Sequence, residues 1–350
     1  MKPLHHPHHI SFASDNYSGV LPEVMEALAA ANGGHVGAYG DDPYTEHLQT
    51  LIRQHFGDAA QAFPVFNGTG ANVLALQACL PRWGAVICAE TAHVHHDESV
   101  APQAVGGFKL WTVPTSDGKL TPEWIAREAY GYGFEHRAQP LAVSITQCTE
   151  LGTVYRPSEI SAISEYCREK GMVLHMDGAR LSNAAASLGV SLREITTDAG
   201  VDIVSFGGTK NGLMFGECVI VLNPEKVSDG LKYLRKLNLQ LASKMRFLSA
   251  QFIALLSDGL WLRSAQHANA MAARLSDGLS QIKRVELVCP TEANGVFARL
   301  PQGVADKLHE QFVFYDWDNE GTVRLMCSFD TREADVDALV AAVKKAVEAV

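Results

Sequence analysis

Two apolar stretches that end in polar residues decide the fold: Val173-Leu174-His175-Met176-Asp177-Gly178-Ala179-Arg180 and Val204-Ser205-Phe206-Gly207-Gly208-Thr209-Lys210. Each is typical of a buried β-strand followed by a turn. Asp177 and Lys210 are 33 residues apart, about the length of one strand–helix–strand unit. Because open α/β sheets bind ligands at the carboxyl ends of their parallel strands, we expect this acid and this amine to face one pocket.

The sheet is predicted to extend on both sides of these stretches. Short apolar runs alternate with segments of helical spacing, which indicates an α/β fold with a covered, mostly parallel sheet. Seven strands are predicted, at Ala62–Phe66, Ala85–Ala89, Phe108–Val113, Ala142–Thr146, Met172–Met176, Ile203–Phe206 and Glu217–Leu222. Helices are predicted at Pro22–Ala31, Ala71–Leu80 and Pro157–Lys170, the last of which begins with Pro and stops at Gly171.

The composition of the chain changes after Asn223, where helical spacing continues to about Ile282 without a strong strand. A second unit is expected beyond it, with strands at Val285–Cys289, Val296–Leu300 and Thr322–Ser328 and a helix at Glu333–Val350. We therefore predict an N-terminal segment (1–45) that packs on the large domain or on a neighbouring subunit, a large domain (46–255) and a small C-terminal α+β domain (256–350).

Composition and charge exclude several classes of protein. The 350 residues are 47% hydrophobic. The 29 basic and 39 acidic residues give a net charge of −10, and the basic residues are scattered singly. A nucleic-acid partner is therefore not expected. The sequence shows neither the roughly 18-residue apolar stretch of a membrane span nor a signal peptide. Seven cysteines without a Cys-x-x-Cys pair suggest no disulfide framework and no zinc site. We expect a cytoplasmic protein without a membrane partner.

Asp177 and Lys210 are the residue types that pyridoxal phosphate requires, because its aldehyde reacts with a lysine amine and its ring nitrogen needs a carboxylate. The turn Asn67-Gly68-Thr69-Gly70 leads from a strand into a helix N-terminus, which attracts a phosphate group. Each of these short motifs alone is more often an ordinary turn or surface dipeptide. Their joint occurrence at strand ends predicts a pyridoxal phosphate site. No metal site is expected.

The chain resembles the low-specificity L-threonine aldolase family of fold-type I pyridoxal-phosphate enzymes along nearly its whole length. The resemblance rests on Ser14-Asp15-Asn16, Gly40-Asp41-Asp42-Pro43, Asn67-Gly68-Thr69-Gly70-Ala71-Asn72, Ala92-His93-Val94, His175-Met176-Asp177-Gly178-Ala179-Arg180-Leu181, Ser205-Phe206-Gly207-Gly208-Thr209-Lys210 and Val323-Arg324-Leu325. It implies the fold-type I architecture, with a large seven-stranded sheet domain and a smaller α+β domain. It also implies a homodimer or homotetramer with shared active sites.

The resemblance implies a role for each matching residue. The catalytic residues would be Lys210, which binds the cofactor covalently, Asp177, which pairs with its ring nitrogen, and His93, which stacks on its ring and transfers protons. The cofactor phosphate would be held by Gly68 and Thr69, and Arg180 would also contact the cofactor. The carboxylate of the amino-acid substrate would be held by Ser14, Arg180 and Arg324, since a guanidinium fork grips a carboxylate with two hydrogen bonds.

The implied reaction is reversible cleavage of L-threonine, L-allo-threonine and related L-3-hydroxy-α-amino acids to glycine and an aldehyde. Many family members carry a histidine after the strand that here ends in Ser144-Ile145-Thr146-Gln147-Cys148-Thr149-Glu150, which contains none. The base for the 3-hydroxyl group is therefore open between His93 and His136. Two other functions also stay open: another fold-type I reaction, by a β-eliminating lyase or an aminotransferase, and a nucleotide-binding or regulatory module without catalysis.

Two basic groups receive no firm assignment. Lys244 and Arg246 could reach a phosphate in a neighbouring subunit or form a solvated helix face. The cluster His5-His6-Pro7-His8-His9 is interpreted as a terminal tail without function.

Overall fold

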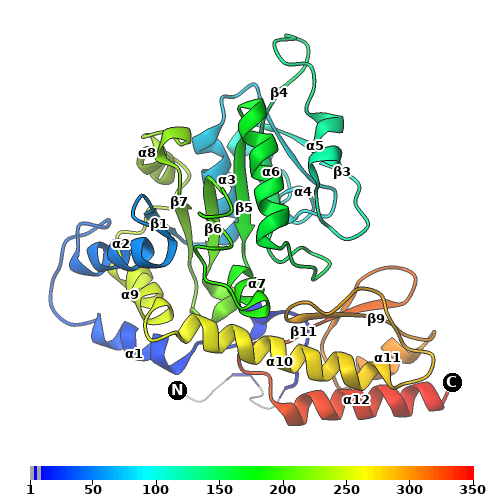
Figure 1. The fold of residues 1–350 in the computed structure, drawn as a ribbon. Helices are drawn as coiled ribbons and strands as arrows, with labels where there is room; N and C mark the ends of the chain where they lie inside the picture. Colours follow the sequence, from blue (N-terminus) through cyan, green and yellow to red (C-terminus); the bar gives the residue numbers. More distant parts are fainter. Residues whose placement is uncertain (1–3, 6–8) are drawn as a thin grey trace.

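The computed structural model of the chain describes residues 4–5 and 9–350, which form two sheets with covering helices (Figure 1). The larger sheet has seven strands in the order β1-β7-β6-β5-β4-β2-β3. Their bounds are β1 Gln61–Val65, β2 Gly84–Ala89, β3 Lys109–Val113, β4 Gln139–Thr146, β5 Val173–Gly178, β6 Ile203–Gly207 and β7 Glu217–Val221. Strands β2 to β6 are parallel to one another, whereas β7 runs antiparallel to both β1 and β6. The seven predicted strands and the mostly parallel sheet are confirmed.

Helices cover both faces of this sheet, with α6 (Pro157–Lys170) on one side and α3 (Gly68–Cys79) on the other (Figure 1). Helix α6 has the predicted limits: Pro157 occupies the first turn, and Gly171 ends the helix with a φ of 68°, a backbone conformation that favours glycine. Helix α3 begins three residues earlier than predicted, because the Asn67 side chain caps it by accepting a hydrogen bond from the Gly70 N–H at 2.8 Å.

The remaining helices connect the two sheets or cover their outer surfaces. Their bounds are α1 Pro22–Ala30, α2 Pro43–Phe56, α4 His93–His96, α5 Pro122–Glu128, α7 Leu181–Leu188, α8 Leu231–Leu237, α9 Met245–Leu256, α10 Leu260–Ser280, α11 Val304–Leu308 and α12 Glu333–Glu348. Short helical turns lie at η1 Asp15–Tyr17, η2 Pro102–Gly106, η3 Thr209–Asn211 and η4 Pro224–Lys226. Among the described residues, no helix has the length and apolar character needed to cross a membrane.

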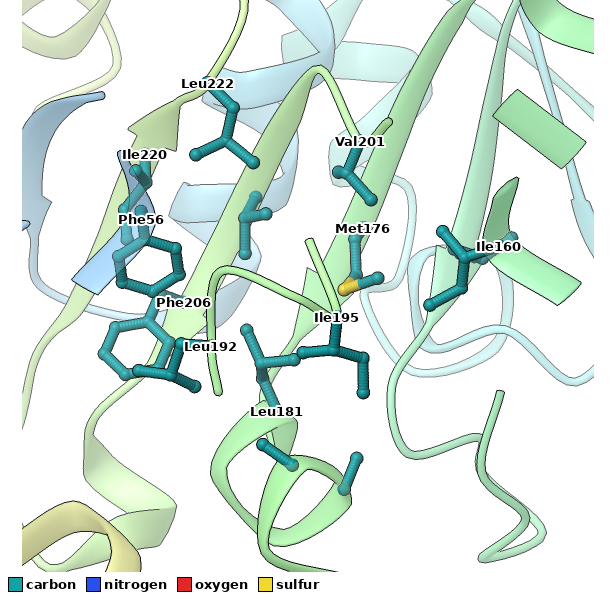
Figure 2. Close-up of a cluster of buried hydrophobic side chains, with 14 of the residues drawn as sticks. Phe56, Ile160, Met176, Leu181, Leu192, Ile195, Val201, Phe206, Ile220 and Leu222 are labelled. Atoms are coloured by element: carbon teal, nitrogen blue, oxygen red, sulfur yellow. The ribbon is translucent and has the colours of Figure 1, made fainter. Parts of the chain in front are cut away.

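The main core lies between the large sheet and the helices that follow its strands. Figure 2 shows Met176 of β5 and Phe206 of β6 among Leu181, Ile195 and Phe56. Phe206 meets Phe56 edge to face, with ring centroids 5.5 Å apart. Burying each such side chain contributes about 1.5–3 kcal/mol, so the carboxyl ends of β5 and β6 rest on a rigid base.

The second sheet has the order β10-β11-β9-β8 and is antiparallel throughout, with β8 Glu286–Leu287, β9 Gly295–Arg299, β10 Tyr315–Asp316 and β11 Thr322–Met326. Helix α10 runs along this sheet and α12 lies beneath α10, at the bottom of Figure 1. Strands β8, β9 and β11 and helix α12 were predicted from the sequence and are confirmed, whereas β10 was not predicted.

The N-terminal segment joins the two sheets. The Phe12 N–H donates to the Val313 carbonyl and the Phe12 carbonyl accepts from the Met326 N–H, both at 2.7 Å, while the Leu21 N–H donates to the Gly212 carbonyl beside the large sheet. Ser14 lies between these anchors. Domain limits at residues 45 and 255 stay a prediction, and within the histidine cluster His6, Pro7 and His8 lie outside the described residues.

Candidate active site

A cleft of about 960 Å³ lies where the carboxyl ends of β4, β5 and β6 meet the beginning of α3 and one edge of the small sheet. All the site residues predicted from the sequence line this cleft: Ser14, Gly68, Thr69, His93, Asp177, Arg180, Lys210 and Arg324. The fold thus brings together residues from the N-terminal segment, the large sheet and the small sheet. Their individual roles stay predictions.

Asp177 is held rigidly at the end of β5. Its side chain is buried; Oδ2 accepts a hydrogen bond from Asn72 Nδ2 at 2.8 Å, and Oδ1 accepts one from the Ala179 N–H at 3.0 Å. Two donors hold this carboxyl group in one orientation. The structure therefore presents a fixed carboxyl group to the cleft.

Lys210 lies in the turn η3 after β6, half-buried in the wall of the cleft. Burial, together with the nearby positive charge of Arg180, lowers the pKa of its amine, although Asp15, Asp177 and Glu217 act in the opposite direction. A lowered pKa leaves more of the amine uncharged and nucleophilic. Burial raises the pKa of neighbouring Glu217 to about 7, and this carboxyl accepts the Gly208 N–H at 2.7 Å.

The beginning of α3 offers a cradle for an anion. The first N–H groups of a helix have no acceptor within it, and its dipole adds positive potential at this end. At Gly68 a Cβ atom would meet nothing within 4 Å, so the space beside this backbone is open. Gly68 and Thr69, the first two residues of this helix, both line the cleft.

His93 is the first residue of α4 and is bound to two carboxyl groups. Its Nδ1 lies 2.9 Å from Glu98 Oε1, and its backbone N–H donates to Glu150 Oε1 at 2.7 Å. The hydrogen bond to Glu98 raises the pKa of His93, with burial opposing it and Asp177 adding to it. Burial and the charge of Asp177 raise the pKa of Glu150 to about 7.

The two arginines differ in their surroundings. Arg180 directs its fork at Asp15, with Nε to Oδ2 at 2.7 Å and Nη2 to Oδ1 at 2.9 Å. The guanidinium of Arg324 lies over the rings of Tyr315 and Trp317, 5.1 and 5.2 Å from their centres. Burial and the charge of Arg180 lower the pKa of Arg324.

Several acidic residues of the site were not predicted to have a role, among them Asp15, Glu98, Glu150 and Glu217. Asp15 belongs to the motif Ser14-Asp15-Asn16, but nothing in the sequence indicates that it pairs with Arg180, 165 residues away. Glu150 lies in the segment 144–150, where many family members carry a histidine and this chain has none. The missing histidine could have drawn attention to Glu150 as a functional residue. Glu98 follows His93 by five residues and carried no distinct signal.

Other candidate groups lie elsewhere. His136 is exposed beside Glu135 and does not line the cleft. Arg246 donates to the carbonyls of Gly33 and Gly34 of its own chain, at 3.4 and 3.3 Å, and neither it nor Lys244 lines the cleft. Within one chain, the candidate bases are therefore the groups that line the cleft.

Among the described residues, a metal-ligand arrangement occurs at His93, Glu98 and Asp177, whose ligand atoms lie within 4.8 Å of one another. The amide nitrogen of Asn72 donates to both Glu98 Oε1, at 2.7 Å, and Asp177 Oδ2, at 2.8 Å. This amide occupies the space between the two carboxylates where a cation would bind. We therefore interpret the cluster as a hydrogen-bond network.

Comparison with known proteins gives concordant matches. Residues 11–301 match the model of the beta-eliminating lyase family. A low specificity L-threonine aldolase from Pseudomonas sp. is 47% identical over 97% of this chain and 98% of its own length, and one from Pseudomonas aeruginosa is 47% identical over 93% and 94%. A threonine aldolase structure from Leishmania major superposes with a TM-score of 0.91 at 32% identity, covering 97% of this chain and 99% of that one. These matches confirm the predicted fold-type I architecture.

Proposed function

Because the chain belongs to the beta-eliminating lyase family and, within it, to the low specificity L-threonine aldolases, we propose that it cleaves L-threonine, L-allo-threonine and related L-3-hydroxy-α-amino acids to glycine and an aldehyde. Membership of this family makes it a pyridoxal-phosphate-dependent lyase. The observation that carries the proposal is the convergence of Lys210, Asp177 and two arginines in one cleft.

The residues of the cleft fit pyridoxal phosphate. An open space beside Gly68 at a helix N-terminus suits the phosphate, a half-buried amine suits the aldehyde, and a buried carboxylate suits the ring nitrogen. When bound, the cofactor supplies an electron sink for the pair of electrons released by cleavage of the Cα–Cβ bond.

Each group of this chain has a defined task in the proposal. Lys210 Nζ would hold the cofactor through its aldehyde, and its lowered pKa makes the amine more nucleophilic. Asp177 would keep a proton on the ring nitrogen, and Asn72 and the Ala179 N–H hold that carboxylate in place. Gly68 and Thr69 would bind the phosphate.

The substrate carboxylate is bound by Ser14, Arg180 and Arg324. Arg324 stands between two aromatic rings, and Arg180 is oriented by Asp15, so both guanidinium groups are fixed before the substrate arrives. Fixing the carboxylate orients the Cα–Cβ bond, and orientation decides which bond of the amino acid breaks. His93 would lie against the cofactor ring and would accept the proton of the 3-hydroxyl group.

The test is product analysis with purified protein, pyridoxal phosphate and L-threonine. We expect equimolar glycine and acetaldehyde, the latter detected with an alcohol dehydrogenase and NADH. Ammonia with 2-oxobutanoate would instead identify an eliminating lyase and reject the proposal.

We also propose that the protein is a homodimer or homotetramer with shared active sites. Phe66 and Phe215 line the cleft yet are partly exposed, with ring centroids 6.3 Å apart, and Met214 beside them is exposed as well. A second subunit would cover this apolar rim. Light scattering coupled to size-exclusion chromatography tests this: a monomeric mass at micromolar concentration rejects it.

A cytoplasmic location is proposed from the cysteines. All seven are free, as expected in a reducing compartment. Fractionation of the native cells with an antibody to the protein tests the location.

A further inference from the structure

Glu98 is a buried carboxylate that lines the cleft. It follows α4, its side chain is 0% exposed, and its Oε1 accepts two hydrogen bonds, from His93 Nδ1 at 2.9 Å and from Asn72 Nδ2 at 2.7 Å. A carboxylate is costly to bury, and it is retained where its hydrogen bonds have a definite use.

The contact between Glu98 and His93 determines where the imidazole carries its hydrogen. A carboxylate oxygen accepts hydrogen bonds, so Nδ1 of His93 must be the donor. In the neutral ring Nε2 is then the unprotonated, basic atom. The His93 side chain lines the cleft and is 37% exposed, and its Nδ1 is bound to the fully buried Glu98, which leaves Nε2 as the ring nitrogen available to a ligand.

Asn72 fixes the network from the other side. Its amide nitrogen donates to Glu98 and to Asp177 at once, so its carbonyl oxygen points away from both carboxylates. The reverse orientation would place this oxygen against two negative groups. Glu98 is therefore held in place by a residue that also holds Asp177.

We infer that Glu98 is the positioning residue of His93, which keeps the hydrogen on Nδ1 and presents Nε2 as the base for the 3-hydroxyl group of the substrate. The inference rests on the proposed function for the identity of that hydroxyl group. The sequence did not identify the base, and the inference assigns it to the pair of His93 and Glu98. In this pair the carboxylate sets the tautomer and the basicity of the histidine.

Several charged groups act on His93 from the elements around it. Glu98 faces it from the turn after α4, Asp177 from β5 and Lys210 from η3, while Glu150 binds its backbone N–H. Of these, Glu98 contributes most to raising the pKa of His93, and Lys210 and burial lower it. Glu150 is an alternative base for the 3-hydroxyl group, because it lines the cleft and the pKa of its carboxyl group is also raised.

The first experiment uses protein freed of cofactor and labelled with ¹⁵N-histidine. Long-range ¹H–¹⁵N NMR reports which ring nitrogen carries the hydrogen, and the His93 signals are identified by their absence in His93→Phe. We expect the Nδ1–H form in the neutral ring, and a lower titration midpoint of His93 in Glu98→Gln. An Nε2–H form in the unmodified protein overturns the inference without any variant of Glu98.

The second experiment measures the pH dependence of kcat/KM for L-threonine in Glu98→Gln, Glu150→Gln and Glu165→Gln. Because a base works when unprotonated, a lower pKa of His93 moves the acid limb of the profile to lower pH. We expect this shift in Glu98→Gln, with kcat reduced about 10-fold or more, a part of the 10²–10⁴-fold contribution of a general base. Glu165 is exposed on α6, and Glu165→Gln serves as the control for the change in charge.

The outcomes separate the inference from the proposed function. Loss of the acid limb in Glu150→Gln, with an unchanged profile in Glu98→Gln, assigns the base to Glu150 and overturns the inference. If NMR shows the expected tautomer and titration but the unmodified enzyme cleaves no 3-hydroxy amino acid, the proposed function fails, and with it the use assigned to Nε2.

Discussion

The ion pair between Asp15 and Arg180 offers the most direct test of how the carboxylate site is built. The Asp15 side chain is 0% exposed, and its two oxygens accept hydrogen bonds from Arg180 Nε and Nη2 at 2.7 and 2.9 Å. Burial alone would raise the pKa of Asp15, but Arg180 and Lys210 hold it below its usual value. Asp15→Asn keeps the shape of the side chain while replacing one acceptor oxygen by an amide donor.

The size of the effect follows from this geometry. The new amide group would face an N–H of Arg180, so at least one of the two bonds is lost, and a hydrogen bond to a charged group contributes about 1.5–3 kcal/mol. Unfolding of a globular chain gains about 2.1 cal/mol/K per residue, so for 350 residues this loss lowers Tm by about 2–4 °C. If Arg180 loses its fixed orientation to the same degree, kcat/KM for L-threonine falls about 10- to 100-fold.

The assay pairs thermal unfolding with steady-state cleavage kinetics, and the control is Asp337→Asn. Arg274 binds Asp337 with the same two-pronged geometry, at 2.8 and 2.9 Å, but the two side chains are 43% and 58% exposed. An exposed pair contributes about 0–1 kcal/mol, so the control should change neither Tm nor kcat/KM appreciably. A normal kcat/KM in Asp15→Asn, whatever its Tm, would refute the claim that Asp15 orients Arg180 for the substrate.

Three further outcomes are expected. Lys210→Ala should lose both the visible absorbance of the bound cofactor and turnover, because the cleft would lack the amine that binds the aldehyde; retained turnover would contradict this. Arg324→Lys should raise KM for the amino acid about 10-fold while the affinity for pyridoxal phosphate, measured by fluorescence titration, stays unchanged, since it keeps the charge but loses the fork. Glu150→Gln should reduce a pH dependence of Tm: burial raises the pKa values of Glu150 and Glu217 to about 7, so the folded state binds more protons and loses stability as pH rises from about 4.5 to 7, and the variant keeps only the contribution of Glu217. An identical fall of Tm over this range in the variant would show that Glu150 is not its source.

The sequence predicted the large sheet well because buried parallel strands are continuous apolar runs, which local pattern alone can identify. It did not predict β10, whose residues Tyr315 and Asp316 are exposed and become a strand only by pairing with Arg324 and Val323. Two residues of exposed chain carry no periodicity, so this strand depends on tertiary contact.

The predicted site residues share one property. Each belongs to a motif in which the residue type alone indicates the role, as the amine of Lys210 does. The residues that sequence reasoning missed act through a partner. Asp15 binds Arg180 across 165 positions and Asn294 across 279, distances over which no local pattern exists. Positioning residues of this kind become visible only when the fold brings the partners together.

The arrangement of these partners explains why the cleft should bind anions. The carboxylates of Asp177 and Glu98 are bound to the neutral amide of Asn72, and that of Asp15 is neutralised by Arg180. Within residues 4–5 and 9–350, Lys210 and Arg324 form no ion pair within 4.0 Å, although both line the cleft. In the proposed function, the charge of Arg324 is available to the amino-acid carboxylate and the amine of Lys210 to the cofactor aldehyde, and the groups around them are positioned before either ligand binds.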